Sequence, residues 1–316
     1  MIVRERPSGL RLFFVIRGSV LPRIVWPLCI TVLLAVIGTV TDGTLFGLKI
    51  TMTPIPFTLI GLALAIFLGF RNSTSYDRYW EGRKLWGELI VVCRSTTRQI
   101  LTFISSDRAG SSEWPPYDPE DRRITMVYRL IAFSHALRHH LRGTDPSEEI
   151  RQYLPEEEVA QLLASHNRPQ YLLQCMAQDL RSCIENKQLY DYFAAGIDQN
   201  LTMLATVVAG CERINNTPIP FTYNLLLHRT AYLYCFLLPF GLVDSIGFMT
   251  PLVVGIVSFT FFGLDALGDE IEDPFGVRPN NLALASMCRT IERDLRAALG
   301  EEQLPEVLQP MGYVLQ

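Results

Sequence analysis

Apolar residues gather in four stretches of the chain, each close to the length that crosses a membrane. These stretches cover residues 24–40, 53–70, 222–243 and 245–264. A helix of about 20 residues rises ~30 Å, which matches the hydrocarbon thickness of a bilayer. The pattern therefore predicts four transmembrane helices in two pairs, the first within residues 24–80 and the second within residues 217–264.

The rest of the chain has helical periodicity without long apolar runs. In residues 81–216, apolar residues recur at three- and four-residue spacing, with a Pro- and Ser-rich loop at 111–119. Residues 265–316 open with an acidic run, continue with an amphipathic helix at 282–299 and end in a tail without periodicity. We expect an all-α protein in which 81–216 forms a cytosolic helical domain and 265–316 a cytosolic C-terminal segment with a loosely ordered tail.

The stretch at 53–70 carries two stripes at four-residue spacing. It opens with Thr53 as an N-cap and Pro54 at the first helical position. One stripe is small, which lets helices approach closely in a membrane, and consists of Gly61, Ala65 and Gly69. The other stripe is large and apolar and consists of Leu62, Ile66 and Phe70. Spacing alone leaves open whether the large stripe faces lipid, the protein core or a pore.

The hexapeptide TPIPFT occurs twice, at 53–58 and at 217–222. An internal duplication and two similar helix starts both explain the repeat. The sequences on either side diverge at once, which favours two helix starts with Thr as the cap and Pro as the first helical residue.

Composition and charge indicate a membrane protein and give no sign of a nucleic-acid partner. The chain has 316 residues, of which 49% are hydrophobic, and a net charge of -4. No small-residue cleavage site follows the N-terminal arginines, which are Arg4, Arg6, Arg11, Arg17 and Arg23. The positive-inside rule and four spans then place both termini in the cytoplasm. The seven cysteines form no CxxC pair and predict free thiols.

Catalytic and cofactor motifs are not found in the sequence. It has no Gly-rich phosphate loop and no GxSxG element. His135 and His139 share a helix face that could bind zinc, but no HExxH pattern supports them, and Arg138 and Arg142 add positive charge. We therefore predict no enzyme, no metal and no cofactor.

Two ionisable residues, His228 and Arg229, lie inside the third apolar stretch. Such residues usually face protein or water and have a functional or structural partner. They can also lie near the cytoplasmic interface and extend toward water. A structural role and a role in a secondary transporter both stay open.

Three motifs give the chain a resemblance to the bestrophin family of ion channels, and most of all to its bacterial members. They are the FLGF exit of the second stretch followed by Arg78-Tyr79-Trp80, the start of the third stretch at 219–223, and the turn at 273–276. The resemblance implies a homopentamer around one central pore in the bilayer, with a bacterial inner membrane as the site of action. It also implies four membrane helices and a helical cytosolic domain in each subunit.

The family's pore positions can be carried over to this chain. They imply a hydrophobic neck at Leu62, Ile66 and Phe70, and a second, cytosolic constriction at Tyr192, with Leu189 as the next candidate. The implied function is passive conduction of small monovalent ions. Animal members conduct chloride and some bacterial relatives favour monovalent cations, and the neck carries no charge that decides between them. A membrane-anchored scaffold or sensor, and a transporter using His228 and Arg229, are the alternatives.

The loop after the turn at 273–276 predicts no calcium site. In animal members, the matching turn precedes a run of acids that helps to bind calcium. Here Asp273 stands for the family's Asn, Arg278 adds a positive charge, Pro279 restricts the loop, and Asn280 and Asn281 offer neutral oxygens only. We therefore expect a channel that is indifferent to calcium.

Overall fold

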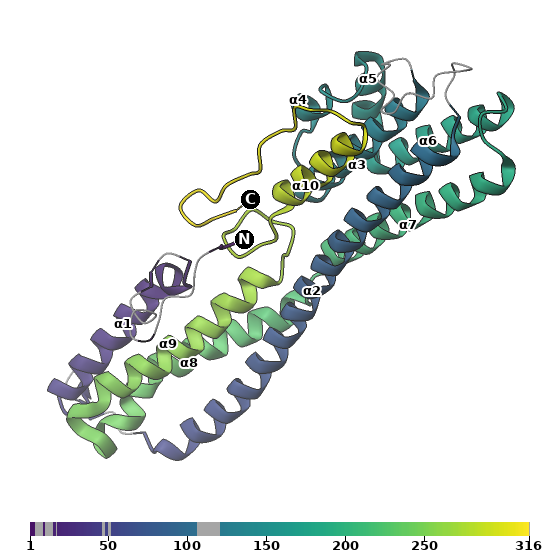
Figure 1. Ribbon diagram of the computed structural model, residues 1–316. Helices are drawn as coiled ribbons and strands as arrows, with labels where there is room; N and C mark the ends of the chain where they lie inside the picture. The colour runs from purple at the N-terminus through teal and green to yellow at the C-terminus, as the bar shows by residue number, and fades with distance from the viewer. Residues whose placement is uncertain are drawn as a thin grey trace. The chain divides into compact units, whose positions relative to one another are not determined.

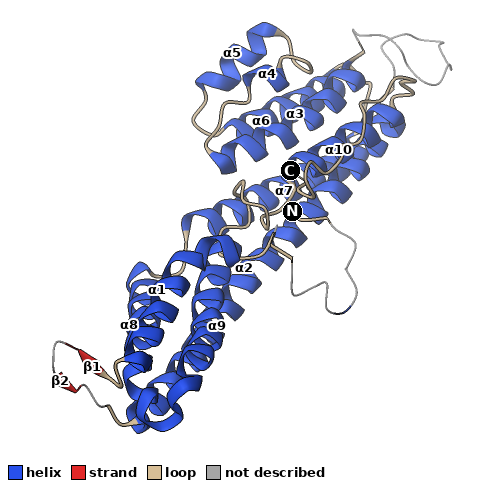
Figure 2. Cartoon of the chain, turned by 90° about the vertical axis from the view of Figure 1, so that its left-hand side faces the viewer, coloured by secondary structure: helices blue, strands red, loops and turns tan. Residues whose placement is uncertain are grey.

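The computed structural model is helical almost throughout the residues that it describes, which are 1–3, 9, 15–16, 18–45, 48–49, 52–105 and 121–315. The regular strands of these residues are β1 (Thr44–Leu45) and β2 (Leu48–Lys49), a short antiparallel hairpin drawn in red in Figure 2. The predicted all-α fold is confirmed. The predicted loop at 111–119 and four of the N-terminal arginines lie outside the described residues: Arg4, Arg6, Arg11 and Arg17.

The chain divides into two compact units. The first, here called the apolar unit, consists of Arg4–Tyr79 and Pro218–Pro274. The second, here called the amphipathic unit, consists of Met1–Val3, Trp80–Thr217 and Phe275–Gln316.

Four α-helical segments form most of the described part of the apolar unit (Figure 1). They are α1 (Leu21–Val40), the first part of α2 (Pro54–Phe103), α8 (Phe221–Ile246) and α9 (Thr250–Ile271). Helix α1 packs against α9 and α8, and the core between them includes Ile24, Leu227 and Phe262. Three described stretches are long and apolar enough to cross a membrane: α1, α2 and the run Phe221–Ile271 that contains α8 and α9.

A tight turn separates α8 from α9. The 3-10 helix η2 (Gly247–Met249) lies between them, and Gly247 has a φ of 51°. This left-handed conformation is unfavourable for residues with a Cβ atom, so glycine suits the position. The Thr250 hydroxyl donates to the Gly247 carbonyl at 2.6 Å, and Pro251 lies in the first turn of α9, where no N–H is needed. The chain can thus reverse direction within a few residues.

Helix α2 is continuous over 50 residues. The sequence predicted an apolar helix at 53–70 followed by a polar, helix-compatible segment. The polar residues 71–84 contain no proline and a single glycine, Gly82, so nothing in them ends a helix. Arg71, Ser75 and Trp86 are all buried, which shows that the helix keeps a buried face along this part of its length.

The two copies of TPIPFT begin helices at different points. Helix α2 begins at Pro54, the second residue of the first copy, as predicted. In the second copy, Thr217 still belongs to the end of α7 (Asp191–Asn216), where its hydroxyl donates to the Arg213 carbonyl. Helix α8 therefore begins only at Phe221, without a side-chain cap. The predicted threonine cap is wrong for this copy.

The amphipathic unit is built around α3 (Arg122–Arg142), which packs against α6 (Arg168–Glu185), α7 and α10 (Leu284–Ala298). Short helices α4 (Ser147–Ile150) and α5 (Glu156–Ala164) complete it. The Asp121 side chain caps α3 by accepting from the Arg123 N–H at 2.8 Å. Large apolar side chains fill the core, among them Trp86, Met126, Leu130 and Phe133. All seven cysteines of the chain are free thiols.

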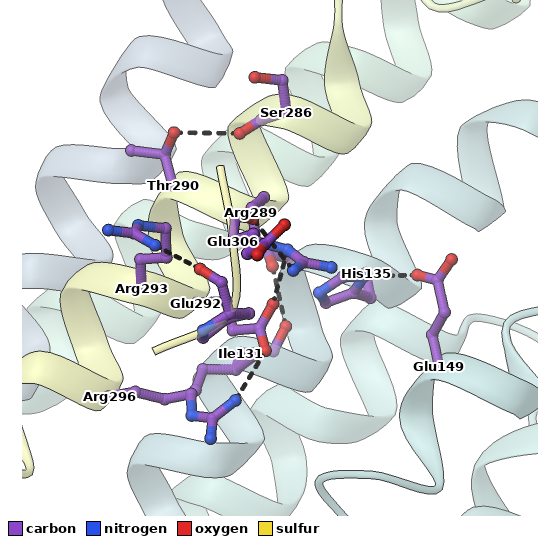
Figure 3. Close-up of polar contacts among 12 residues, drawn as sticks. Ile131, His135, Glu149, Ser286, Arg289, Thr290, Glu292, Arg293, Arg296 and Glu306 are labelled. Carbon is purple, nitrogen blue, oxygen red and sulfur yellow. Dashed lines mark hydrogen bonds and ion pairs between the residues drawn. The ribbon is translucent and has the colours of Figure 1, made fainter. Parts of the chain in front are cut away.

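The C-terminal tail is held in place, contrary to the prediction of a loosely ordered tail. Arginines of α10 bind it: Arg289 donates to the Glu306 carbonyl at 3.3 Å, Arg293 donates to the Pro305 carbonyl, and Arg296 pairs with Glu301 at 2.7 Å. Figure 3 shows the α10 arginines. Two of these three contacts are made by backbone carbonyls of the tail, which a pattern of side chains does not reveal.

Candidate pore-lining site

The large stripe on α2 is exposed to the outside of the chain. Leu62, Ile66 and Phe70 have exposed fractions of 62%, 49% and 63%. Leu64 and Leu68, on the other side of the same helix, are buried in the core with α1, α8 and α9. Helix α2 therefore presents an apolar face on successive turns that its own chain leaves uncovered.

The small stripe on α2 has two kinds of environment. A Cβ atom added to Gly61 would lie 2.7 Å from the hydroxyl of Tyr234 on α8, so glycine is needed there for close packing within the chain. A Cβ atom at Gly69 would meet nothing within 4 Å. Ala65 and Gly69 are exposed, so among the three residues of the predicted small stripe Gly61 alone packs closely against another helix of the described chain.

A buried ion-pair network begins one residue after the large stripe. The Arg71 side chain is 1% exposed, and its Nη1 donates to Asp265 Oδ1 at 2.6 Å. Its Nη2 pairs with Asp269, and Glu272 lies 3.8 Å away. The structure buries Arg71 among carboxylates of α9 and of the residue that follows it. The sequence does not reveal these partners.

The network continues to α8. His228 Nδ1 lies 2.7 Å from Asp265 Oδ2, and the His228 ring packs on Tyr232 with centroids 4.2 Å apart. The Glu272 carboxylate accepts from the Ile219 N–H and from Asn224 Nδ2, both at 3.0 Å. Three carboxylates thus surround one guanidinium. Two of these carboxylates also accept from groups on or next to α8. Asp265 contacts the half-exposed imidazole of His228, and Glu272 contacts the donors at the start of α8. The sequence singled out His228, and the structure supplies its partner.

The candidates for the second constriction differ in exposure. Tyr192, near the start of α7, is 86% exposed, whereas Leu189 is 3% exposed and packs into the core of the amphipathic unit. Leu189 is therefore not available to line an aqueous path in this conformation. The neighbouring Tyr190 is also exposed, and sequence reasoning did not select it.

The histidines of α3 form hydrogen bonds with carboxylates. His135 Nδ1 lies 2.6 Å from Glu149 Oε2, a contact drawn as a dashed line in Figure 3. His140 Nε2 lies 2.8 Å from Glu212 Oε1. Arg138 also binds Glu149. Within the described residues, no group of His, Cys, Asp and Glu side chains is arranged to hold a metal ion.

Glu149 is the acidic centre of this cluster. Burial alone would raise the pKa of its carboxyl, but hydrogen bonds from His135, His139 and Arg138 outweigh that effect and hold the pKa well below the ordinary value of 4.5. A carboxyl with a depressed folded-state pKa stabilises the protein above its unfolded-state pKa. This contribution is lost as the pH falls below about 4.5 toward the folded-state value.

Replacing Glu149 with Gln is expected to lower stability at pH 7 and to have a smaller effect near pH 4. The loss at pH 7 is about 1–2 kcal/mol, because Arg138 loses its charged partner while solvent screens the half-exposed carboxyl. Thermal unfolding of both proteins at the two pH values measures the difference. Glu148→Gln, a change at the exposed neighbouring glutamate, is the matched control. An equal deficit at both pH values would contradict this account.

The fold and the site together define a helical membrane protein with an uncovered apolar face on its longest helix. Residues 1–297 match the family described as the Bacterial/Fungal Bestrophin protein. The chain belongs to this family. Because the family is one of ion channels, the predictions of a bestrophin-type channel and of a protein that is not an enzyme are confirmed.

Known relatives match the chain over nearly all of its length. It is 41% identical over 308 residues to the voltage-dependent anion channel-forming protein YneE of Salmonella typhi, with 96% of each chain covered. It is 40% identical over 313 residues to the protein of the same name in Escherichia coli, with 98% of each covered. A crystal structure of a bacterial bestrophin homolog from Klebsiella pneumoniae is 40% identical, with a TM-score of 0.79 and coverage of 89% of this chain and 100% of that chain.

Proposed function

We propose that the protein conducts small monovalent ions passively through a homopentameric pore whose neck is formed by Leu62, Ile66 and Phe70. The observation that carries the proposal is the exposed apolar stripe on α2, opposite the buried Leu64 and Leu68. Five copies of this face around one axis make three successive apolar rings. A narrow apolar ring holds water poorly, so it can gate by dewetting without any moving charge.

A scaffold or sensor needs no such face, because it requires no lumen. An apolar stripe could face lipid instead, but lipid is also met by the outer faces of α1, α8 and α9, and the stripe is followed at once by a buried charge network. In a homopentamer, Leu62, Ile66 and Phe70 of each copy would face the same three residues of the others. The proposed oligomer therefore accounts for a face that one chain leaves uncovered.

Two features bear on which ion passes. The neck side chains carry no charge, so they control whether ions can pass but do not select between anions and cations. The relatives in Salmonella typhi and Escherichia coli are named as anion channel-forming proteins, and we propose anions as the conducted species. The exposed Tyr192 is proposed as the second constriction, in the amphipathic unit. Leu189 is not included, because it is buried.

A planar bilayer containing the purified protein tests the function directly. Under a tenfold gradient of potassium chloride, an ideally anion-selective pore reverses at the chloride potential, about 59 mV from zero. A reversal at the potassium potential would show cation selectivity and leave the pore in place. Saturating flux that depends on His228 and Arg229 would support a transporter. If correctly assembled protein gave no current at all, the membrane-anchored scaffold or sensor would be the remaining interpretation.

The assembly and its orientation are tested separately. We propose that both termini lie in the cytoplasm, because an even number of spans follows the N-terminal arginines. The mass in detergent is expected to equal five chains. A cysteine introduced at Val3 should resist a membrane-impermeant thiol reagent added from the periplasmic side. A monomer that still conducts, or a labelled Val3 position in intact cells, would contradict this arrangement.

Calcium is expected not to open the channel. In the amphipathic unit, Arg142 donates to the carbonyls of Phe275 and Gly276 at 3.0 and 3.2 Å. The Asn281 side-chain oxygen accepts from the Arg278 N–H at 2.7 Å. These oxygens already serve donors, whereas calcium needs six to eight oxygen ligands. Calorimetric titration of the purified protein should show no binding at micromolar calcium. Micromolar binding together with increased channel opening would overturn this expectation.

A further inference from the structure

A cavity of about 350 Å³ lies within the amphipathic unit, between the last turns of α2 and the end of α10. Its apolar wall includes Leu101 of α2 and Leu295 of α10, together with two alanines of α10. Its polar lining comes from Asp294 on α10 and from four residues of α2: Arg94, Thr97, Arg98 and Thr102. None of these residues belongs to the proposed pore.

Thr97 leaves a hydrogen bond unmade at the cavity wall. The residue is 1% exposed, and its hydroxyl has no hydrogen-bond partner in the described part of the chain. Other threonines of α2 follow the usual pattern, in which the hydroxyl donates to the carbonyl four residues earlier: Thr96 does so to Val92 at 2.8 Å, and Thr102 to Arg98 at 2.7 Å. A buried hydroxyl without a partner is destabilising. Thr97 therefore has an unused donor buried just behind the cavity wall, which a ligand can reach only by displacing wall atoms.

Among the residues that the structure describes, the charges of the lining leave one guanidinium without an ion-pair partner. Arg94 Nε donates to Asp294 Oδ2 at 2.9 Å, and its Nη2 binds the same oxygen, so this pair is internally balanced. Arg98 forms no ion pair with another described residue and is exposed at the mouth of the cavity. The lining thus combines an apolar wall, one free positive charge and one free hydroxyl.

We propose that this cavity is a binding site for a small amphipathic monocarboxylate. The carboxylate would pair with Arg98 and accept from the Thr97 hydroxyl, while the apolar body packs against Leu101 and Leu295. The volume lies in the range of small-molecule sites, which are mostly apolar with a few convergent polar groups. A single negative charge matches the single unpaired guanidinium, whereas a second charge on the ligand would lie near the Asp294 carboxylate.

The site can be tested with the full-length protein in detergent and a fluorinated probe. Fluorine NMR of 4-(trifluoromethyl)benzoate should show saturable line broadening, and the neutral 4-(trifluoromethyl)benzamide should not. Arg98→Gln is expected to weaken binding by about tenfold, the loss of one charge-assisted hydrogen bond. Thr97→Val should weaken it by about threefold, and Thr97→Ser, which retains the hydroxyl, should bind like the parent protein.

Arg181→Gln is the matched control, because Arg181 is an exposed arginine of α6 that pairs with Glu185 outside the cavity. It should bind the benzoate like the parent protein. Unfolding temperatures of all variants identify any that are misfolded, and the two Thr97 variants give an answer that does not depend on Arg98. Equal binding of benzoate and benzamide, the absence of saturable binding, or equal affinity in the Arg98 and Arg181 variants would overturn the proposal. None of these measurements depends on whether the protein conducts ions.

Discussion

Replacing Phe70 with alanine is expected to raise the single-channel conductance or the open probability. Phe70 is the last and bulkiest residue of the proposed neck, and its ring is largely exposed on α2. Truncation in five subunits widens the ring and makes it easier to hydrate. A barrier lowered by ~1.4 kcal/mol corresponds to about a tenfold rise in ion flux. Ile66→Ala should act in the same direction with a smaller effect. Single-channel records in planar bilayers measure both.

Phe67→Ala is the matched control for the neck. Phe67 is similarly exposed, but its side chain points about 100° around the helix from Ile66. Its truncation should alter stability or assembly more than conductance. If Ile66→Ala and Phe67→Ala give the same single-channel records, then the stripe of Leu62, Ile66 and Phe70 does not line the pore.

Replacing Arg71 with Gln is expected to destabilise the protein strongly. The substitution leaves the buried Asp265 without its guanidinium and removes the link from α2 to Asp269. Breaking a buried pair by removing one partner costs about 3–5 kcal/mol, because an uncompensated charge stays inside the protein. Thermal unfolding in detergent should show a clear drop in the transition temperature.

A second variant separates charge from packing in this network. Asp265→Asn alone should also destabilise, whereas combining it with Arg71→Gln should cost less than the sum of the two changes, because no unpaired charge is left between them. Arg181→Gln, which removes an exposed arginine paired with Glu185, should leave the transition temperature nearly unchanged. Strictly additive effects of the Arg71 and Asp265 variants would show that the two side chains do not act as a pair.

Periodicity in the sequence was sufficient to predict the helical fold and the existence of a large apolar stripe on α2, but not that the stripe is exposed. Both depend on local spacing: four-residue intervals put Leu62, Ile66 and Phe70 on one face, and an uncharged run sets the length of the apolar helix. The family resemblance added the pore interpretation, which spacing alone left open.

Long-range pairing was beyond the reach of the sequence. The partner of Arg71 could not be predicted from the sequence, because Asp265 is 194 residues away along the chain. A charge near the end of the fourth apolar stretch was the available signal, but periodicity does not say which charges meet. The burial of Leu189, which the family resemblance gave as the second candidate for the cytosolic constriction, likewise depends on tertiary packing that the sequence does not reveal.

Continuity of α2 has a consequence for how related chains can vary in length. The exposed stripe ending at Phe70 and the buried face that includes Trp86, Leu89 and Cys93 are parts of one helix. Deleting one residue between Phe70 and Trp86 would turn one face by about 100° with respect to the other, whereas inserting seven residues would turn it by only about 20°. Natural length changes in this segment should therefore come in multiples close to whole helical turns, and single-residue insertions or deletions should be excluded by helical phase rather than by chemistry.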